Sequence, residues 1–157
     1  MKRTTKLFSL LLIAVLICGC KQENWLDWKL QNELWLQNNA KQEGVITTPT
    51  GLQYKCIKKG PGGGARPDEA KTVTIDYEGK MINGYVFDSA EAYSSTVSSF
   101  VDGFAEGLKK MNKWDEYEFY IPYDLGYGAS GVGTEGTSSF IPPYSTLIFR
   151  VHLSSVY

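Results

Sequence analysis

The sequence predicts an α+β domain: a curved antiparallel sheet of about five strands wrapped around one short helix, with a further helix ahead of it. Alternation of apolar and polar residues, typical of strands, recurs in several runs, whereas helical spacing inside the domain is confined to residues 100–111. No strand–helix–strand repeat is present, so the strands are expected to be antiparallel. Pro142-Pro143 form a rigid corner directly ahead of the last strand.

The first nineteen residues have the organisation of a bacterial export signal. Basic residues precede an apolar run over residues 7–17, which is shorter than the roughly 20 residues of a membrane-spanning helix. The ending Ile17-Cys18-Gly19-Cys20 is similar to a bacterial lipobox, which implies cleavage ahead of Cys20 and lipidation of that cysteine. An ordinary signal peptide or an uncleaved anchor is the alternative.

Lipidation would hold the mature chain on a membrane without crossing it, because each buried CH₂ of an acyl chain contributes ~0.8 kcal/mol. Lys21, rather than Asp, follows Cys20 and indicates an outer membrane where the cell has one, with the membrane face left open. We therefore divide the chain into a lipoprotein signal (1–19), an anchor, tether and helix (20–46), and a folded domain (47–157).

The mature chain is expected to be mildly acidic and poor in cysteine. Residues 1–19 contain three of the 16 basic residues and none of the 17 acidic ones, so their removal leaves 13 basic side chains and a net charge of −4. This charge argues against nucleic acid as a partner. Cys56 would be the one unmodified cysteine, and its strand-like setting indicates a small buried side chain rather than a reactive thiol.

The helix ahead of the domain is expected from about Trp25 to Lys41, with Asn24 as its cap and Gly44 beyond its end. It carries two apolar stripes, of which one can dock on the domain while the other is left for a membrane interface or a second chain. Tryptophan suits a membrane interface, so the stripe that contains the three tryptophans is the candidate for membrane contact or a dimer. Loose packing of the helix on its own domain is the alternative. The stripes are Trp25, Trp28, Trp35 and Leu36, and Leu26, Leu30 and Leu34.

Inside the domain, strands are expected over 52–58, 71–80, 114–121 and from residue 147 onward, and a tight turn at 82–84 leads from the second of these into residues 85–88. The glycine loop 60–64 lacks the Lys-Ser/Thr of a phosphate cradle, and residues 90–99 are small, polar and poor in core residues. Gly103 and Gly107 weaken the helix 100–111 by about 1 kcal/mol each, which is tolerated where a helix must press close to a sheet.

Catalytic groups of the usual kinds are scarce. The single histidine, His152, and the absence of a Cys/His cluster argue against a Ser-His-Asp triad and a zinc site, and no cofactor is expected. Asp76 and Glu78 share one strand parity and are expected to face solvent rather than to act as paired acid and base. The remaining aromatic residues have two interpretations: core packing, or a pocket, since several fall in loops or at the ends of elements.

From about residue 47 to residue 157 the chain resembles the FKBP-type peptidyl-prolyl isomerases, and residues 44–54 resemble the lead-in of their bacterial cell-envelope members. Each motif alone is weak, but their order and spacing over some 110 residues are specific. The motifs are Asp76-Tyr77-Glu78-Gly79, Phe87-Asp88-Ser89, Phe100-Val101-Asp102-Gly103-Phe104, Leu125-Gly126-Tyr127-Gly128, and Ile141-Pro142-Pro143 through Phe149.

The resemblance implies a role for each matched position in binding an Xaa-Pro peptide. Tyr77, Phe87 and Phe149 would wall the proline ring, with Phe104 as its floor. Phe104 stands where this family commonly has Trp, and the Arg often found shortly after Phe87-Asp88-Ser89 is missing.

The polar positions follow from the same resemblance. Val101 would offer its backbone N–H to a substrate carbonyl, and Tyr127 would donate from its hydroxyl. Asp88 would sit beside the twisting carbonyl. Phe140 and Ile141 would cover the ring, and Phe100 would also contact substrate.

The resemblance implies a peptidyl-prolyl cis-trans isomerase that assists folding of exported proteins at the cell envelope, by binding and desolvating Xaa-Pro in an aromatic pocket. Proline-containing polypeptides would be its partners. The alternative on the same fold is a non-catalytic peptide-binding or chaperone module.

Overall fold

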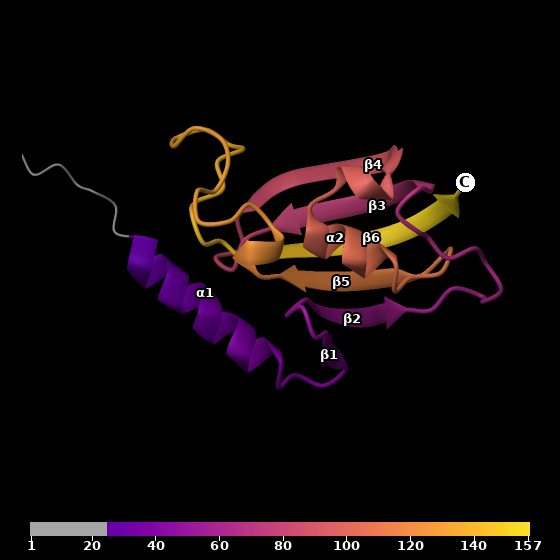
Figure 1. The fold of residues 1–157 in the computed structure, drawn as a ribbon, viewed down its shortest axis with the longest axis horizontal. Helices are drawn as coiled ribbons and strands as arrows, with labels where there is room; N and C mark the ends of the chain where they lie inside the picture. Colours follow the sequence, from indigo (N-terminus) through magenta and orange to yellow (C-terminus); the bar gives the residue numbers. More distant parts are fainter. Residues whose placement is uncertain (1–24) are drawn as a thin grey trace, which may run out of the picture.

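The computed structural model describes residues 25–157 and shows one six-stranded antiparallel sheet with the strand order β1-β2-β5-β6-β3-β4. Figure 1 shows the short helix α2 lying across one face of this curved sheet, with α1 at one end of it. The elements are α1 Trp25–Asn39, β1 Val45–Thr47, β2 Gln53–Lys58, β3 Thr72–Lys80, β4 Val86–Thr96, η1 Val97–Ser99, α2 Asp102–Leu108, β5 Glu116–Ile121, η2 Tyr123–Leu125 and β6 Leu147–Val156.

The expected fold class is confirmed, with six strands in place of about five. The additional strand is the short β1, which pairs with β2. Strand β4 also continues to Thr96, through small and polar residues in which we did not predict a strand. Most of β4 is exposed, so its side chains carry little hydrophobic signal, and its pairing with β3 holds it in the sheet.

Alternation along β6 sets the two faces of the sheet. Phe149, Val151 and Leu153 are buried on the face that α2 covers, whereas Arg150 is exposed on the opposite face. Ile148, on that opposite face, is nevertheless buried, and its register partner on β5 is Tyr120. The second face is therefore covered locally.

Helix α1 packs at this covered place with its tryptophan stripe. The Trp35 ring lies 5.7 Å from that of Tyr120, and the Trp28 indole N–H donates to Ser145 Oγ at 2.9 Å. Of the two interpretations of the stripes, the structure shows the tryptophans against their own domain. The side that α1 turns outward is the leucine row, in which Leu26, Leu30 and Leu34 are 62%, 54% and 47% exposed.

The signal segment and Cys20 lie outside the described residues. Within residues 25–157, no helix combines the length and the apolar character that crossing a bilayer requires.

Helix α2 presses directly on β5 because two of its positions lack a side chain. A Cβ placed on Gly107 would lie 2.8 Å from ring atoms of Phe119, and one on Gly103 would collide with Ile121. The expectation that these glycines permit close packing is confirmed. The close approach fixes the distance between α2 and the sheet.

We predict that Gly107→Ala destabilises the fold by about 1–3 kcal/mol, because overpacking outweighs the ~1 kcal/mol that alanine adds to helix propensity. Urea unfolding at equal protein concentration measures this difference. An increase in the stability of Gly107→Ala would contradict the prediction, since it would show that there is room for a methyl group between α2 and β5.

Asp115, in the turn ahead of β5, is buried with its charge satisfied. Its carboxylate accepts the N–H groups of Gly60 at 2.8 Å and Asn112 at 2.9 Å, and the Lys59 ammonium lies 3.3 Å away. Burial alone raises the pKa of the Asp115 carboxyl, but these hydrogen bonds and the lysine charge together hold that pKa below its ordinary value.

Because the folded-state pKa of Asp115 is lowered, its contribution to stability is present above the unfolded pKa of about 3.9 and is lost as pH falls through the folded pKa. We predict that Asp115→Asn costs ~2 kcal/mol at pH 7 and that this cost shrinks as pH falls toward 3. Urea unfolding across this range checks it, and a cost that stays constant with pH would contradict it.

Candidate functional site

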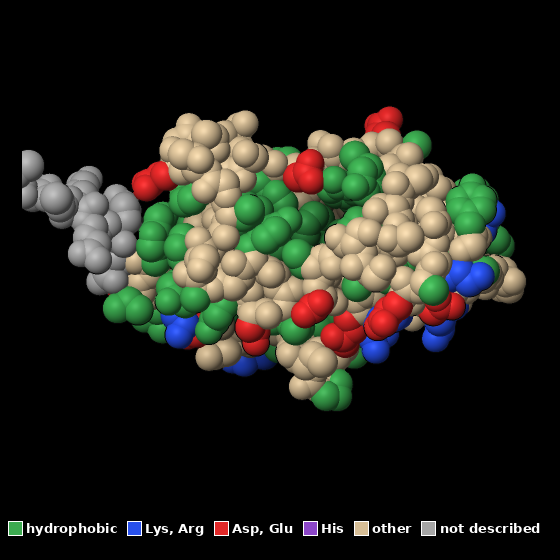
Figure 2. Space-filling view, turned by 45° about the horizontal axis from the view of Figure 1, so that its top comes forward, with side chains coloured by type: hydrophobic (Ala, Val, Ile, Leu, Met, Phe, Trp, Pro, Cys, Tyr) green, Lys and Arg blue, Asp and Glu red, His purple; other side chains and the backbone are tan. Residues whose placement is uncertain are grey.

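A cavity of about 270 Å³ opens between the sheet and the start of α2. Figure 2 shows hydrophobic side chains gathered around a hollow in the surface. We call this cavity the aromatic cavity, since six of its nine lining residues have phenyl or phenol rings. It is lined by Tyr77, Asp88, Tyr93, Ser99, Phe100, Val101, Phe104, Tyr127 and Phe149.

Phe104 is the centre of the aromatic packing. Its ring stacks on Phe100 at a centroid distance of 4.6 Å and meets the edge of Phe149 at 4.9 Å and of Tyr77 at 6.2 Å. Only 2% of Phe104 and 6% of Phe149 are exposed, so both lie at the bottom of the cavity. The floor and one wall are thus fixed rings with few alternative rotamers.

Phe87 supports the wall from behind. Its ring meets Phe149 edge-on at 5.5 Å, and a Cβ on Gly79 would lie within 2.9 Å of Phe87 ring atoms. The glycine of the Tyr77-Glu78-Gly79 run therefore leaves room for Phe87 to reach Phe149.

A hydrogen bond at the rim joins Tyr77 to Asp88. The Tyr77 hydroxyl donates to Asp88 Oδ2 at 2.7 Å. Burial, followed by this bond to Asp88, raises the pKa of Tyr77 well above its ordinary value. Tyr77 thus stays protonated and holds the carboxylate at the edge of the cavity.

Tyr127 and Val101 contribute donors that no protein group uses. Burial, with a smaller effect from the charge of Asp88, raises the pKa of Tyr127, so its hydroxyl remains a donor. Neither this hydroxyl nor the Val101 N–H has a hydrogen-bond acceptor within the part of the chain that the structure describes. Two free donors and one carboxylate therefore surround an apolar floor.

The structure brings seven of the ten expected pocket residues to the lining of the cavity: Tyr77, Asp88, Phe100, Val101, Phe104, Tyr127 and Phe149. Phe87 and Ile141 are not among the lining residues. Phe87 is half-buried against Phe149, while Ile141 is 3% exposed, belongs to the core and pairs with Val132.

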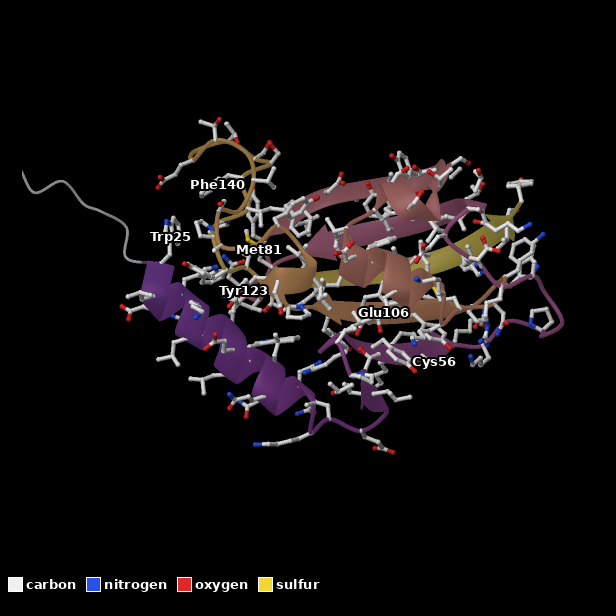
Figure 3. The ribbon with its side chains drawn as sticks, viewed as in Figure 1. Trp25, Cys56, Met81, Glu106, Tyr123 and Phe140 are labelled. Atoms are coloured by element: carbon white, nitrogen blue, oxygen red, sulfur yellow. The ribbon has the colours of Figure 1, made fainter. Side chains whose placement is uncertain are left out.

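Phe140, which we expected to cover the proline ring, is not among the lining residues. Its ring lies beside that of Trp25 on α1, with centroids 6.1 Å apart, as Figure 3 shows. The two residues that we expected to cover the proline ring together thus lie apart, with Ile141 in the core and Phe140 in contact with α1.

Two lining residues, Tyr93 and Ser99, were not among the predicted site residues. Tyr93 contacts the rings of Tyr77 at 5.9 Å and Phe100 at 6.2 Å. A register shift in β4 near Ala92, whose N–H donates to Asp76 Oδ1, sets which side chains of β4 face the cavity. Tyr93 is the one aromatic residue among residues 90–99, and that was the available signal.

A larger hollow of about 700 Å³ lies on the opposite face of the sheet, and its lining is mainly polar. Four of its polar side chains form two pairs: Arg150 with Glu116, and His152 with Asp76 at 3.1 Å. Asp76 and Glu78 therefore face outward, as expected. Among residues 25–157, no group of histidine, cysteine and acidic side chains is arranged to hold a metal ion.

Comparison with known proteins places the chain in one family. The family model described as "FKBP-type peptidyl-prolyl cis-trans isomerase" matches residues 63–154, and the model of the domain amino-terminal to such isomerases matches residues 21–56. The first match covers more than half of the chain and includes all nine residues that line the aromatic cavity.

Individual relatives agree with this match. The chain is 39% identical over 132 residues to "Outer membrane protein MIP" of Legionella longbeachae, covering 82% of this chain and 54% of that protein. It is 37% identical to the FKBP-type isomerase FkpA of Escherichia coli, covering 83% of this chain and 47% of that protein. The chain thus spans about half the length of the curated relatives it matches.

A solved structure also agrees. The crystal structure of FkpA from Escherichia coli superimposes with a TM-score of 0.75 and 34% sequence identity, covering 83% of this chain and 59% of that one.

Proposed function

Since the chain belongs to the FKBP-type peptidyl-prolyl cis-trans isomerase family, we propose that it isomerises Xaa-Pro bonds of polypeptides in the aromatic cavity. The observation that carries the proposal is the pairing of a buried aromatic floor with two free donors at its rim, Tyr127 and Val101. As a folding assistant, the protein would act on exported chains at the cell envelope.

The proposed mechanism transfers no proton and forms no covalent bond. Amide resonance sets a barrier of ~18–20 kcal/mol to rotation about the bond. The rings of Phe104, Phe149 and Tyr77 would hold the proline and remove water from the imide, which favours the twisted form with its weaker charge separation. Preferring this form over both planar ones by ~8 kcal/mol would accelerate rotation roughly 10⁶-fold.

The polar groups have separate proposed roles. Tyr127 and Val101 would donate to substrate carbonyls on either side of the proline and keep the backbone in place while the bond turns. Asp88, held by Tyr77, would lie beside the twisting carbonyl and disfavour its planar, more strongly polarised state. Phe87 and Ile141 would act from behind the lining by fixing its rings.

We predict that the wild-type protein accelerates cis–trans exchange of an Ala-Pro peptide and that Tyr127→Phe lowers kcat/KM about tenfold, the cost of one hydrogen bond made in the twisted state. Asp88→Ala is expected to lower it as well. A protease-free exchange assay measures these rates.

Tyr157→Phe, at the exposed C-terminal residue, is the matched control and should retain full activity. No acceleration by the wild type would contradict the proposal. Suppression of aggregation without isomerisation would instead support the peptide-binding or chaperone alternative on the same fold.

We further propose the lipoprotein organisation expected from the first twenty residues: a signal over 1–19, a lipid anchor on Cys20 and a folded domain from residue 47. One relative bears the name of an outer membrane protein, which supports a place in the envelope. For a membrane or a second chain, α1 offers its leucine row, because the tryptophan stripe contacts its own domain.

For the anchor, we predict that Cys20→Ser abolishes incorporation of labelled palmitate and releases the protein from the membrane fraction, because several acyl chains supply the binding. Cys56→Ser, at the one cysteine among residues 25–157, should retain both label and location. Membrane retention of Cys20→Ser without label would contradict the lipid anchor.

A further inference from the structure

Asn32, in the middle of α1, has a buried polar side chain that the proposed mechanism does not use. It is 1% exposed. Its Oδ1 accepts the backbone N–H of Thr146 at 2.7 Å, and its Nδ2 donates to the Trp28 carbonyl at 2.8 Å. Both halves of the amide are therefore satisfied, and one of them ties α1 to the segment ahead of β6.

A second hydrogen bond from α1 holds the neighbouring residue of the same segment. The Trp28 indole N–H donates to Ser145 Oγ at 2.9 Å, and the Ser145 hydroxyl donates to the Pro142 carbonyl at 2.8 Å. Consecutive residues of the chain, 145 and 146, are thus fixed by two side chains one helical turn apart on α1.

These contacts flank a strained turn. Tyr144 has a φ of 62°, in the left-handed region that an aromatic residue rarely occupies. Such a conformation persists only when its surroundings hold it. Here the Tyr144 ring meets Tyr123 edge-on at 5.2 Å, and the Lys29 ammonium of α1 lies 5.5 Å from the Tyr144 ring and 5.8 Å from the Tyr123 ring.

The strained turn is bonded to the loop that carries Tyr127. The Tyr144 N–H donates to the Gly128 carbonyl at 3.1 Å, and the Gly128 N–H donates to the Tyr123 carbonyl at 2.7 Å. Tyr127 therefore sits directly before a residue held from both sides by the two tyrosines that α1 contacts. Figure 3 shows Tyr123 at the end of the sheet next to α1.

We propose that α1 supports the active site from outside the cavity and that Asn32 is a positioning residue for Tyr127, acting through Thr146, the Tyr144 turn and Gly128. The inference rests on the proposed role of Tyr127 as a donor to substrate. A donor on a loop contributes fully only if the loop is fixed, and a misplacement of about 1 Å can cost on the order of 100-fold in rate.

The test is a double-mutant cycle with Asn32→Ala and Tyr127→Phe, measured as kcat/KM where near-UV circular dichroism shows a folded protein. We expect Asn32→Ala to lower kcat/KM about tenfold in the wild type and less than twofold in Tyr127→Phe, because the positioned hydroxyl is then already absent. Asn38→Ala, at an exposed asparagine of the same helix, is the matched control and should leave activity unchanged. Equal losses from Asn32→Ala in both backgrounds would overturn the proposal.

A second readout does not depend on catalysis. The amide resonances of Tyr127 and Gly128 should shift in Asn32→Ala and stay in place in Asn38→Ala; unmoved resonances in Asn32→Ala would overturn the positioning role. A wild type without isomerase activity would refute the proposed function, while this spectral comparison would still decide the positioning.

If Asn32→Ala does not fold, Trp28→Phe replaces it in both measurements. It keeps an aromatic ring, though a smaller one, and removes the donor to Ser145, so we expect the same pattern with a smaller loss. Equal losses from Trp28→Phe with and without the Tyr127 hydroxyl, or unmoved Tyr127 and Gly128 resonances, would overturn the proposal.

Discussion

The close approach of α2 to β5 determines where the rings of the aromatic cavity lie. With Gly103 and Gly107 against Ile121 and Phe119, the helix lies nearer to the sheet than a helix with side chains at these positions can. This distance sets Phe104 edge-on against Phe119 at 5.5 Å and against Phe149 at 4.9 Å. It also places Val101, the residue that caps α2, at the rim of the aromatic cavity.

The cavity combines features that usually oppose each other. Its floor is buried and rigid, yet its rim keeps donors without protein partners, which would be costly if no ligand or water satisfied them. The floor has no N–H donor, because Phe104 stands where the family commonly has Trp. Polar recognition then depends on the rim, and above all on Tyr127, whose loop is tied to the turn that α1 holds.

The sequence predicted the elements whose signal is local. Alternation identified β3, β5 and β6, helical spacing identified α2, and the motif order placed seven of the expected site residues at one cavity. It did not predict β4 beyond Asp88, because that exposed edge strand is defined by pairing with β3 rather than by buried side chains. Phe140 was misplaced for a related reason: its contact with Trp25 joins residues far apart in the chain, and no periodicity reports it.

The most direct test of the account is two-dimensional NMR exchange spectroscopy of an Ala-Pro peptide with a catalytic amount of the protein. We predict exchange cross peaks between the cis and trans proline forms at mixing times where the free peptide shows none, together with peptide-dependent shifts of the Val101 and Tyr127 amides. Shifts of these amides without exchange would reduce the cavity to a peptide-binding site. Exchange with no perturbation of either amide would contradict the assignment of the reaction to the aromatic cavity.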